Sequence, residues 1–391
     1  MSRNGMSLNP IPLNRRNFIK FAGLGCITPA LTFLNGCTHQ KFYNPDQDIL
    51  LGGGMFKKND ELHHVLAVVN LTQQETQLVE LDFLAHGIII DPDDKKRLIA
   101  FEKNGPGAAA INLNDNFVTA KITTGGDRYF NGHGVFVASG DALFCTETFF
   151  SDHNGTIVIR DGKNLETLDE FPTYGDNPHE CKLIDDGAVL LVTNAGSSDT
   201  ENSQPAVSYI DVQTQQLIER VTLSNEQLNT GHIAIAADGS LIVTSAPREG
   251  LEQTQSGGVS IRSGKQPMLT MTQPELVIKQ MTGEALSIAI DNKHNIAAVT
   301  HPEANMVTFW SIDKRELVKA MSVPQPRGIT LSLDEKSFII SYDINTSMAL
   351  VSTKDLTANT GSIMQPTYIS GSHIINWSKT LTEIMPKDVY S

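Results

Sequence analysis

Apolar residues recur along the chain in short alternating runs, each followed by a tight turn and a second apolar run. Seven such units are visible, and 40 to 55 residues separate the start of one from the start of the next. Two further strand-like runs fit into each interval, as "GTIVIRDG" and "LETLDEFP" do in the second one. Four strands repeated at this period are the signature of a β-propeller.

The two ends of the chain supply complementary parts of one blade. The last unit, around His373, lacks its outer pair of strands, whereas "HHVLAVVNLTQQETQLVELDF" near residue 63 is an outer pair without an inner one. Joining the two closes a ring and removes exposed strand edges. We therefore expect an all-β fold, a seven-bladed β-propeller that forms a single domain over residues 63–391.

The N-terminal segment is expected to be an export signal over residues 1–36, followed by a tether over 37–62. "NRRNFIK" is similar to the twin-arginine pattern, and "LNGC" resembles the box after which lipoproteins are cleaved and acylated, here on Cys37. The apolar run between the two patterns is shorter than the roughly 20 residues of a membrane span. Each methylene of the acyl chains contributes about 0.8 kcal/mol of binding free energy when it enters the bilayer, so acylation attaches such a protein to a membrane. The expected location is the periplasm, with Thr38 favouring the outer membrane over the inner.

The composition of the chain limits the classes of molecule that it is expected to bind. The formal net charge is −14, and nucleic acids bind clustered lysine and arginine, so nucleic acid is not an expected partner. Two cysteines, Cys145 and Cys181, remain beyond the signal, both in apolar strand-like runs. Burial as free thiols is the commoner outcome there, although an exported protein can also form a disulfide.

The first residue of each repeat is the candidate site. In a propeller the inner strand of every blade starts at the mouth of the central channel, so these seven residues converge there. Five of them are histidines and candidate ligands of a transition metal, iron or copper: His86, His133, His179, His232 and His373. The other two, Ser287 and Arg327, are candidate ligand-binding residues, and Arg327 favours a carboxylate or phosphate. Glu147 and Glu180 are further candidate ligand-binding residues, as partners of the histidines.

A structural role for these histidines is the alternative. A histidine at a strand start can hydrogen bond to the backbone of a neighbouring blade, and opposite sides of a channel can be too far apart to share one ion. Two other histidines, His153 and His301, are expected to lie solvated in loops around the rim. The long polar loops at 148–154, 196–205 and 248–258 are expected to surround the same mouth.

The run from Tyr129 to Gly196 closely resembles the domain-of-unknown-function 1513 family of exported bacterial proteins. It carries, in order, Gly-His-Gly-Val-Phe, Thr-Glu, Gly-x-Ile, Arg-Asp, Glu-Phe-Pro, Gly-x-x-Pro-His-Glu and Asn-x-Gly. Gly231 stands where members usually have arginine. The resemblance implies a propeller exported by the twin-arginine route, encoded near imelysin-type iron-regulated proteins and dihaem cytochrome-like oxidoreductases, with no established catalytic residues.

The first functional hypothesis is a lipid-anchored, non-enzymatic propeller that binds a metal, a metal complex or a partner protein at the histidine-lined mouth and serves iron acquisition. Its expected partners are the membrane, through Cys37, and periplasmic iron-uptake proteins of the imelysin and dihaem cytochrome types. A second hypothesis is a metal-dependent hydrolase or lactonase-like propeller, with water activated at His86, His133 and His179. A third is a protein-interaction scaffold without a metal.

Overall fold

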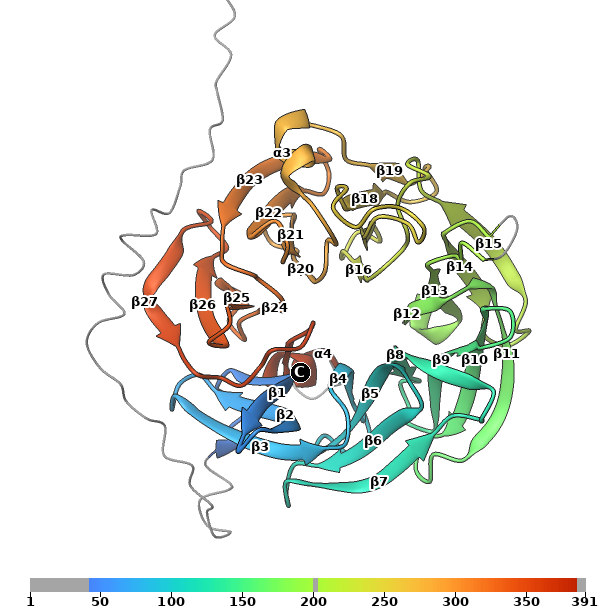
Figure 1. The fold of residues 1–391 in the computed structure, drawn as a ribbon, viewed down its shortest axis with the longest axis horizontal. Helices are drawn as coiled ribbons and strands as arrows, with labels where there is room; N and C mark the ends of the chain where they lie inside the picture. Colours follow the sequence, from blue (N-terminus) through green and yellow to red (C-terminus); the bar gives the residue numbers. More distant parts are fainter. Residues whose placement is uncertain (1–41, 200–202, 385–391) are drawn as a thin grey trace, which may run out of the picture.

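The computed structural model describes residues 42–199 and 203–384. These residues form a disc of seven four-stranded antiparallel blades around a central channel (Figure 1). The prediction of an all-β, seven-bladed propeller is confirmed. The expected export signal and the acylated Cys37 lie outside the described residues.

Each blade is a meander from the channel to the rim, so strands at the same level of different blades share an environment. The inner strands line the channel: β4 (Ala85–Ile90), β8 (Arg128–Phe136), β12 (Pro178–Ile184), β16 (Ile233–Ile235), β20 (Ile288–Asp291), β24 (Ile329–Leu331) and β28 (Ile375–Asn376). The second strands are β1 (Ile49–Lys58), β5 (Arg97–Gly105), β9 (Ala142–Phe149), β13 (Val189–Asn194), β17 (Leu241–Ser245), β21 (Ile296–His301) and β25 (Ser337–Tyr342).

The two remaining levels complete the blades. The third strands are β2 (Glu61–Asn70), β6 (Gly107–Asn112), β10 (Asn154–Asp161), β14 (Ala206–Asp211), β18 (Gly258–Arg262), β22 (Met306–Ser311) and β26 (Ser347–Ser352). The outer strands are β3 (Glu75–Leu81), β7 (Phe117–Thr123), β11 (Thr167–Asp176), β15 (Leu217–Thr222), β19 (Leu269–Thr270), β23 (Glu316–Ser322) and β27 (Ala358–Met364).

The hydrophobic core lies between the faces of neighbouring blades. Middle strands such as β21 and β22 are buried along their whole length because a blade covers each of their faces. Outer strands such as β7 are mostly exposed. Two free cysteines, Cys145 and Cys181, are buried in this core, as their apolar surroundings in the sequence indicated.

The ring is closed by a blade that both ends of the chain build. The strand order is β28-β1-β2-β3, with Leu50 opposite Asn376 and Leu51 opposite Ile375. Closure between the termini was expected, but the N-terminal part contributes three strands rather than two. The interpretation of residues 37–62 as a tether alone is therefore wrong for β1.

The glycines of β1 explain why this strand was missed. "LGGG" reads as a loop in the sequence, yet Gly53 and Gly54 lie against the backbone of neighbouring segments and Gly52 against the side chain of Ile369. A Cβ at Gly53 would be 2.0 Å from the carbonyl oxygen of Ala85, and one at Gly54 would be 1.9 Å from that of Tyr368. Only glycine lets β1 approach the neighbouring chain this closely.

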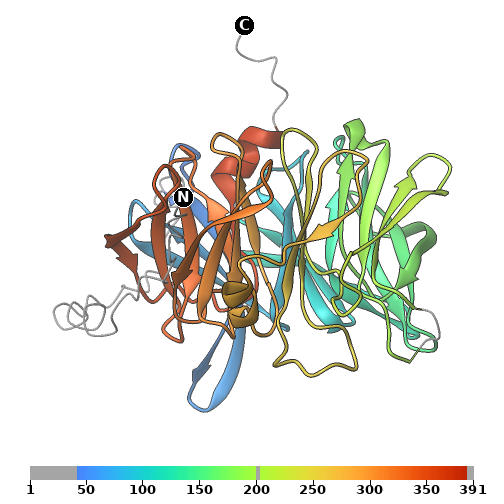
Figure 2. The ribbon, with the colours of Figure 1, turned by 90° about the horizontal axis from the view of Figure 1, so that it is seen from above.

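The two faces of the disc differ. Hairpin β1–β2 protrudes from one face, and helix α4 (Trp377–Ile384) covers part of the other (Figure 2). Because β1 runs antiparallel to β28, the hairpin marks the face where the inner strands begin, which is the channel mouth. Trp377 anchors α4 in the core, and a short helix, α3 (Glu275–Gln280), lies at the periphery. Among the described residues, neither helix has the length and hydrophobicity to cross a membrane.

Candidate functional site: a histidine cluster in the channel

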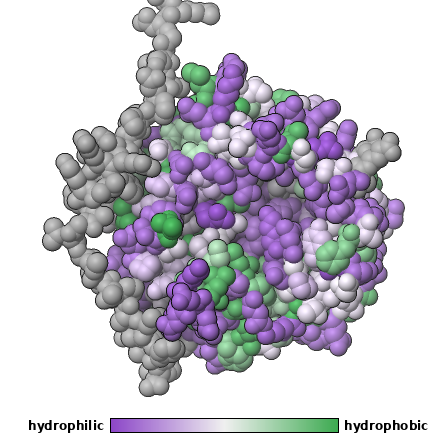
Figure 3. Space-filling model, viewed as in Figure 1, coloured by the Kyte–Doolittle hydropathy of each residue, from purple (hydrophilic) through white to green (hydrophobic). Residues whose placement is uncertain are grey.

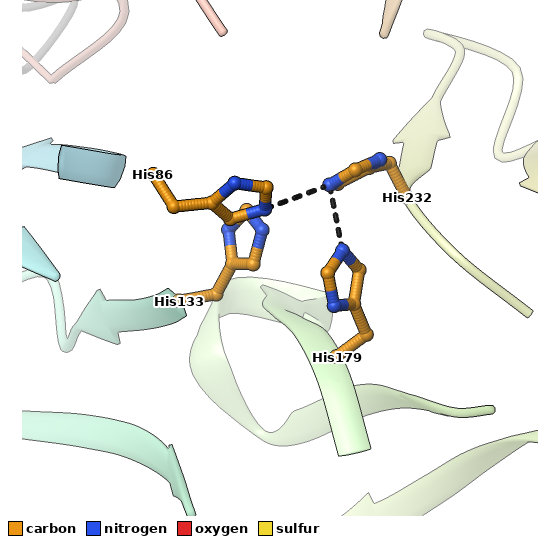
Figure 4. Close-up of side chains that lie close together, drawn as sticks. All are labelled: His86, His133, His179 and His232. Carbon is orange, nitrogen blue, oxygen red and sulfur yellow. Dashed lines mark hydrogen bonds between the residues drawn. The ribbon is translucent and has the colours of Figure 1, made fainter. Parts of the chain in front are cut away.

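The seven residues predicted to open the inner strands do meet in the channel. His86, His133 and His179 lie on β4, β8 and β12, and His232 directly precedes β16. Ser287 precedes β20, while Arg327 and His373 lie two residues before β24 and β28. The ring nitrogens of His86, His133, His179 and His232 all lie within 4.8 Å of one another (Figure 4). We call these four residues the histidine cluster.

His373 joins the cluster through one nitrogen, Nε2 of His232. That atom is 2.8 Å from Nε2 of His179, 2.8 Å from Nε2 of His373 and 3.4 Å from Nε2 of His86. An imidazole nitrogen has one in-plane site, which either donates or accepts a single hydrogen bond. At most one of the three contacts is therefore a good hydrogen bond. The remaining nitrogens face each other without a proton between them.

A metal ion resolves this conflict. An ion about 2.0–2.1 Å from each nitrogen places neighbouring nitrogens about 2.9 Å apart in square-planar geometry and about 3.4 Å apart in tetrahedral geometry. The separations around His232 cover this range. In addition, Nε2 of His133 is buried and has no hydrogen-bond partner among the described residues. The donor set therefore fits a transition metal, for which neutral imidazole is a preferred ligand.

The five histidines are held in their neutral form. The pKa of each is lowered well below its ordinary value of 6.5, and burial is the largest cause in every case. The positive charge of Lys103 lowers all five further. At neutral pH the lone pairs are consequently available, so metal binding displaces no proton from these rings.

Glycines beside the histidines let the rings approach the backbone. Gly132 has a φ of +97°, and a Cβ there would be 2.6 Å from Cδ2 of His86. A Cβ at Gly87 would be 2.2 Å from the carbonyl oxygen of Gly132 and 3.0 Å from Nδ1 of His133. The Gly-His-Gly and His-Gly sequences therefore have a packing reason, since any side chain at Gly132 displaces His86.

Ser287 and Arg327 lie beside His373. The hydroxyl oxygen of Ser287 is 3.4 Å from Nδ1 of His373. The guanidinium of Arg327 donates to the carbonyl oxygen of Gly371 at 3.3 Å and to the hydroxyl of Ser372 at 3.4 Å. Arg327 thus adds positive charge near the cluster without a hydrogen bond to a ring.

The two glutamates expected to support the histidines have other partners. Glu147 is buried, and its carboxylate is 2.8 Å from Nη2 of Arg160 on the neighbouring strand β10. Glu180 reaches the channel, but its oxygens accept from Nζ of Lys182 at 3.0 Å and from the amide of Ile233 at 2.7 Å. Neither glutamate hydrogen bonds to a cluster histidine, so the expected pairing is wrong for both.

Lys103 lies near the site and was not found from the sequence. Lys103 reaches the mouth because β5 extends past its own blade and pairs with β8, with Lys103 opposite Asn131. Nothing in the sequence around Lys103 indicates that β5 continues beyond its own blade. The expectation for His301 was wrong, because it is fully buried at the end of β21, with Nε2 2.8 Å from Oγ1 of Thr308.

A cavity adjoins the cluster on the side towards α4. Its volume is about 730 Å³, and His133, His232, His373 and Ser287 line it together with residues of all seven inner strands. We call this cavity the tunnel. On the outside, hydrophilic side chains surround the centre of the face of the disc shown in Figure 3.

Comparison with solved structures agrees with the fold. Hydrazine synthase of Kuenenia stuttgartiensis is similar with a TM-score of 0.61 at 14% identity, over 75% of this chain and 92% of that one. Dihydro-heme d1 dehydrogenase NirN in complex with DHE is similar with a TM-score of 0.57 at 10% identity, over 86% of this chain and 76% of that one. No curated protein matches the sequence.

The family named from the Tyr129–Gly196 motifs is found independently over most of the propeller. The family described as "Protein of unknown function (DUF1513)" matches residues 79–368, which include four of the five channel histidines. The chain therefore belongs to the DUF1513 family.

Proposed function

We propose that this protein binds a transition metal at the histidine cluster and serves metal handling, in the first place iron acquisition. The observation that carries the proposal is convergence: four buried ring nitrogens from four blades lie within 4.8 Å of one another. A structural histidine needs one or two hydrogen-bond partners, not three other imidazoles. Holding several neutral imidazoles together in a buried channel is unfavourable without an ion that they all bind.

The donor atoms limit which metal ions the cluster is suited to bind. All the donors are neutral nitrogens, and imidazole suits iron, copper, zinc and nickel, whereas calcium and magnesium prefer oxygen. Iron or copper is our proposed ion. The structural similarity to NirN supports a link to iron, because that protein is named a dihydro-heme d1 dehydrogenase.

The cellular setting rests on the signal patterns and on the family. A twin-arginine signal and an acylated Cys37 give a periplasm-facing protein anchored to a membrane, with the outer membrane favoured. The family resemblance supports imelysin-type and dihaem cytochrome-like proteins as partners in iron uptake. A Cys37→Ser variant tests the anchor: we expect it to move from the membrane fraction to the soluble periplasmic fraction, whereas an unchanged distribution contradicts acylation.

Elemental analysis tests the metal site. The protein is purified from the periplasm without chelators or a histidine tag, beside a His133→Ala/His179→Ala variant. The matched control is His64→Ala/His153→Ala, which removes two histidines outside the cluster. We expect close to one metal ion per chain in the parent and the control and none in the cluster variant. Equal metal contents in all three samples, or none in any after reconstitution, contradict the proposal.

A metal-dependent hydrolase is the second candidate, and the tunnel is the observation that favours it. The tunnel gives a small molecule a way to His133, His232 and His373, as a reaction at the metal requires. A hydrolase also gains from a carboxylate that can act as a general base, and Glu147 and Glu180 are both paired with cations. The binding function therefore ranks first.

A further inference from the structure

The tunnel is lined by the edges of the inner strands along its length. Its lining includes runs of consecutive residues, such as Gly87 to Ile90 on β4 and His133 to Ala138 from β8 onwards. A strand that turned one face to the tunnel would contribute every second residue, so consecutive residues show that the strand edges line it. The free N–H and C=O groups of these edges make the wall hydrophilic as well as apolar.

Positive charge surrounds the cluster on both sides. Lys103 and Arg327 lie on the mouth side, and Lys182 lines the tunnel. Each of them lowers the pKa of at least one channel histidine through its charge. Of the carboxylates near this part of the channel, Glu180 and Glu383 line the tunnel, with Glu180 bound to Lys182, and Glu284 offsets Lys103 in part. No carboxylate among the described residues hydrogen bonds to a cluster histidine.

A metal ion bound here therefore receives no charge compensation from its ligands. Neutral imidazoles leave the full charge of the ion in place, and the neighbouring ammonium and guanidinium groups add to it in a buried setting. Protein metal sites usually meet this need with a carboxylate or thiolate ligand, but this cluster has neither. An anion from solution is the remaining source of negative charge.

We propose that the metal takes a small exogenous anion as an additional ligand, bound on the tunnel side between the ion, the hydroxyl of Ser287 and the ammonium of Lys182. This inference rests on the proposed metal site. Ser287 is buried at the end of the tunnel, beside His373, where its hydroxyl can donate to such a ligand. Lys182 donates one ammonium proton to Glu180, and its remaining donors can reach an anion from the tunnel wall. We expect this ligand to be a small monovalent anion, either inorganic or a short carboxylate, that fits in the tunnel next to the histidine rings.

Azide is the probe, because its complexes with Cu(II) absorb visible light. The full-length protein is loaded with Cu(II), its copper content is measured, and azide is titrated while the charge-transfer band is recorded. We expect a saturable band in the parent, with the azide dissociation constant raised about tenfold in Lys182→Met and several-fold in Ser287→Ala. Lys265→Met, which removes an exposed lysine in another loop, is expected to bind azide as the parent does.

Copper content separates the two proposals. If the parent binds copper but gives no azide band, or if the Lys182 and Ser287 variants bind azide as the parent does, the anion site is overturned and the metal site stands. If the parent binds no copper, or binds as much as His133→Ala/His179→Ala does, the metal site fails and the anion site fails with it.

Discussion

Two kinds of buried histidine occur in this propeller, and they differ in what surrounds them. His301 is fully buried between strands of one blade and pairs with the hydroxyl of Thr308, which also accepts from the indole of Trp310. The histidines of the cluster are almost as buried, but their closest partners are each other. An unpaired ring nitrogen occurs in both regions, at Nδ1 of His301 and Nε2 of His133. Burial and an unpaired nitrogen therefore do not distinguish the two regions, and the proposed metal site rests on the convergence of several donors.

The largest expected effect is on the pH dependence of stability without metal. The channel histidines stay neutral in the folded protein, while in the unfolded chain they gain protons as the pH falls below about 6.5. The unfolded state then binds more protons, so stability is complete above pH 6.5 and is lost as the pH falls. Five histidines, at about 1.4 kcal/mol each, give a loss of about 7 kcal/mol between pH 7.5 and 5.5.

Urea unfolding at the two pH values, with a chelator present, measures this loss. We expect it to be about 3 kcal/mol smaller in His133→Ala/His179→Ala, because three of the five histidines remain. The His64→Ala/His153→Ala control is expected to match the parent. An identical pH dependence in all three proteins means that the cluster is protonated in the folded state, against its burial.

Removing the metal is expected to have the next largest effect. An ion that binds only the folded state, at a thousand times its dissociation constant, stabilises the protein by about 4 kcal/mol. Chelation should therefore lower the melting temperature of the parent and leave that of His133→Ala/His179→Ala unchanged. A melting temperature that chelation does not move contradicts strong binding at the cluster.

Substitution of His301 is expected to act on stability alone. His301→Ala removes a large buried side chain and its hydrogen bond to Thr308, which keeps only the indole of Trp310, and this costs about 3 kcal/mol. Denaturant unfolding measures the loss, and elemental analysis should find the metal content unchanged. Loss of metal in this variant would remove the distinction between the two kinds of histidine.

Gly132→Ala is expected to have the smallest effect and the most local one. The new Cβ collides with His86, and a displaced ligand weakens metal binding about tenfold, or about 1.4 kcal/mol. Gly187→Ala is the matched control, since Gly187 also has a positive φ, +87°, but open space around it. Both variants carry backbone strain, so only Gly132→Ala should change the metal affinity in a competition titration with a chelator of known affinity.

The sequence predicts the ring of histidines better than their surroundings. The position of His133 or His179 follows from the repeat, because every inner strand begins at the same end of the channel. Glu147 on β9 instead contacts Arg160 on β10. The repeat does not predict this pairing, because it depends on which face of each strand the two side chains occupy. Strand β1 was missed because its glycines resemble a loop unless the close approach of Ala85 is known.

The closing blade also makes two features of the fold depend on one segment of the chain. Strand β28 and His373 follow the strands of all the other blades, whereas β1, with which β28 pairs, precedes them. A nascent chain that stops before residue 373 has neither a sealed circle nor its fifth channel histidine. Closure of the ring and full assembly of the channel histidines thus depend on the same segment, so that a chain cut short before β28 lacks both.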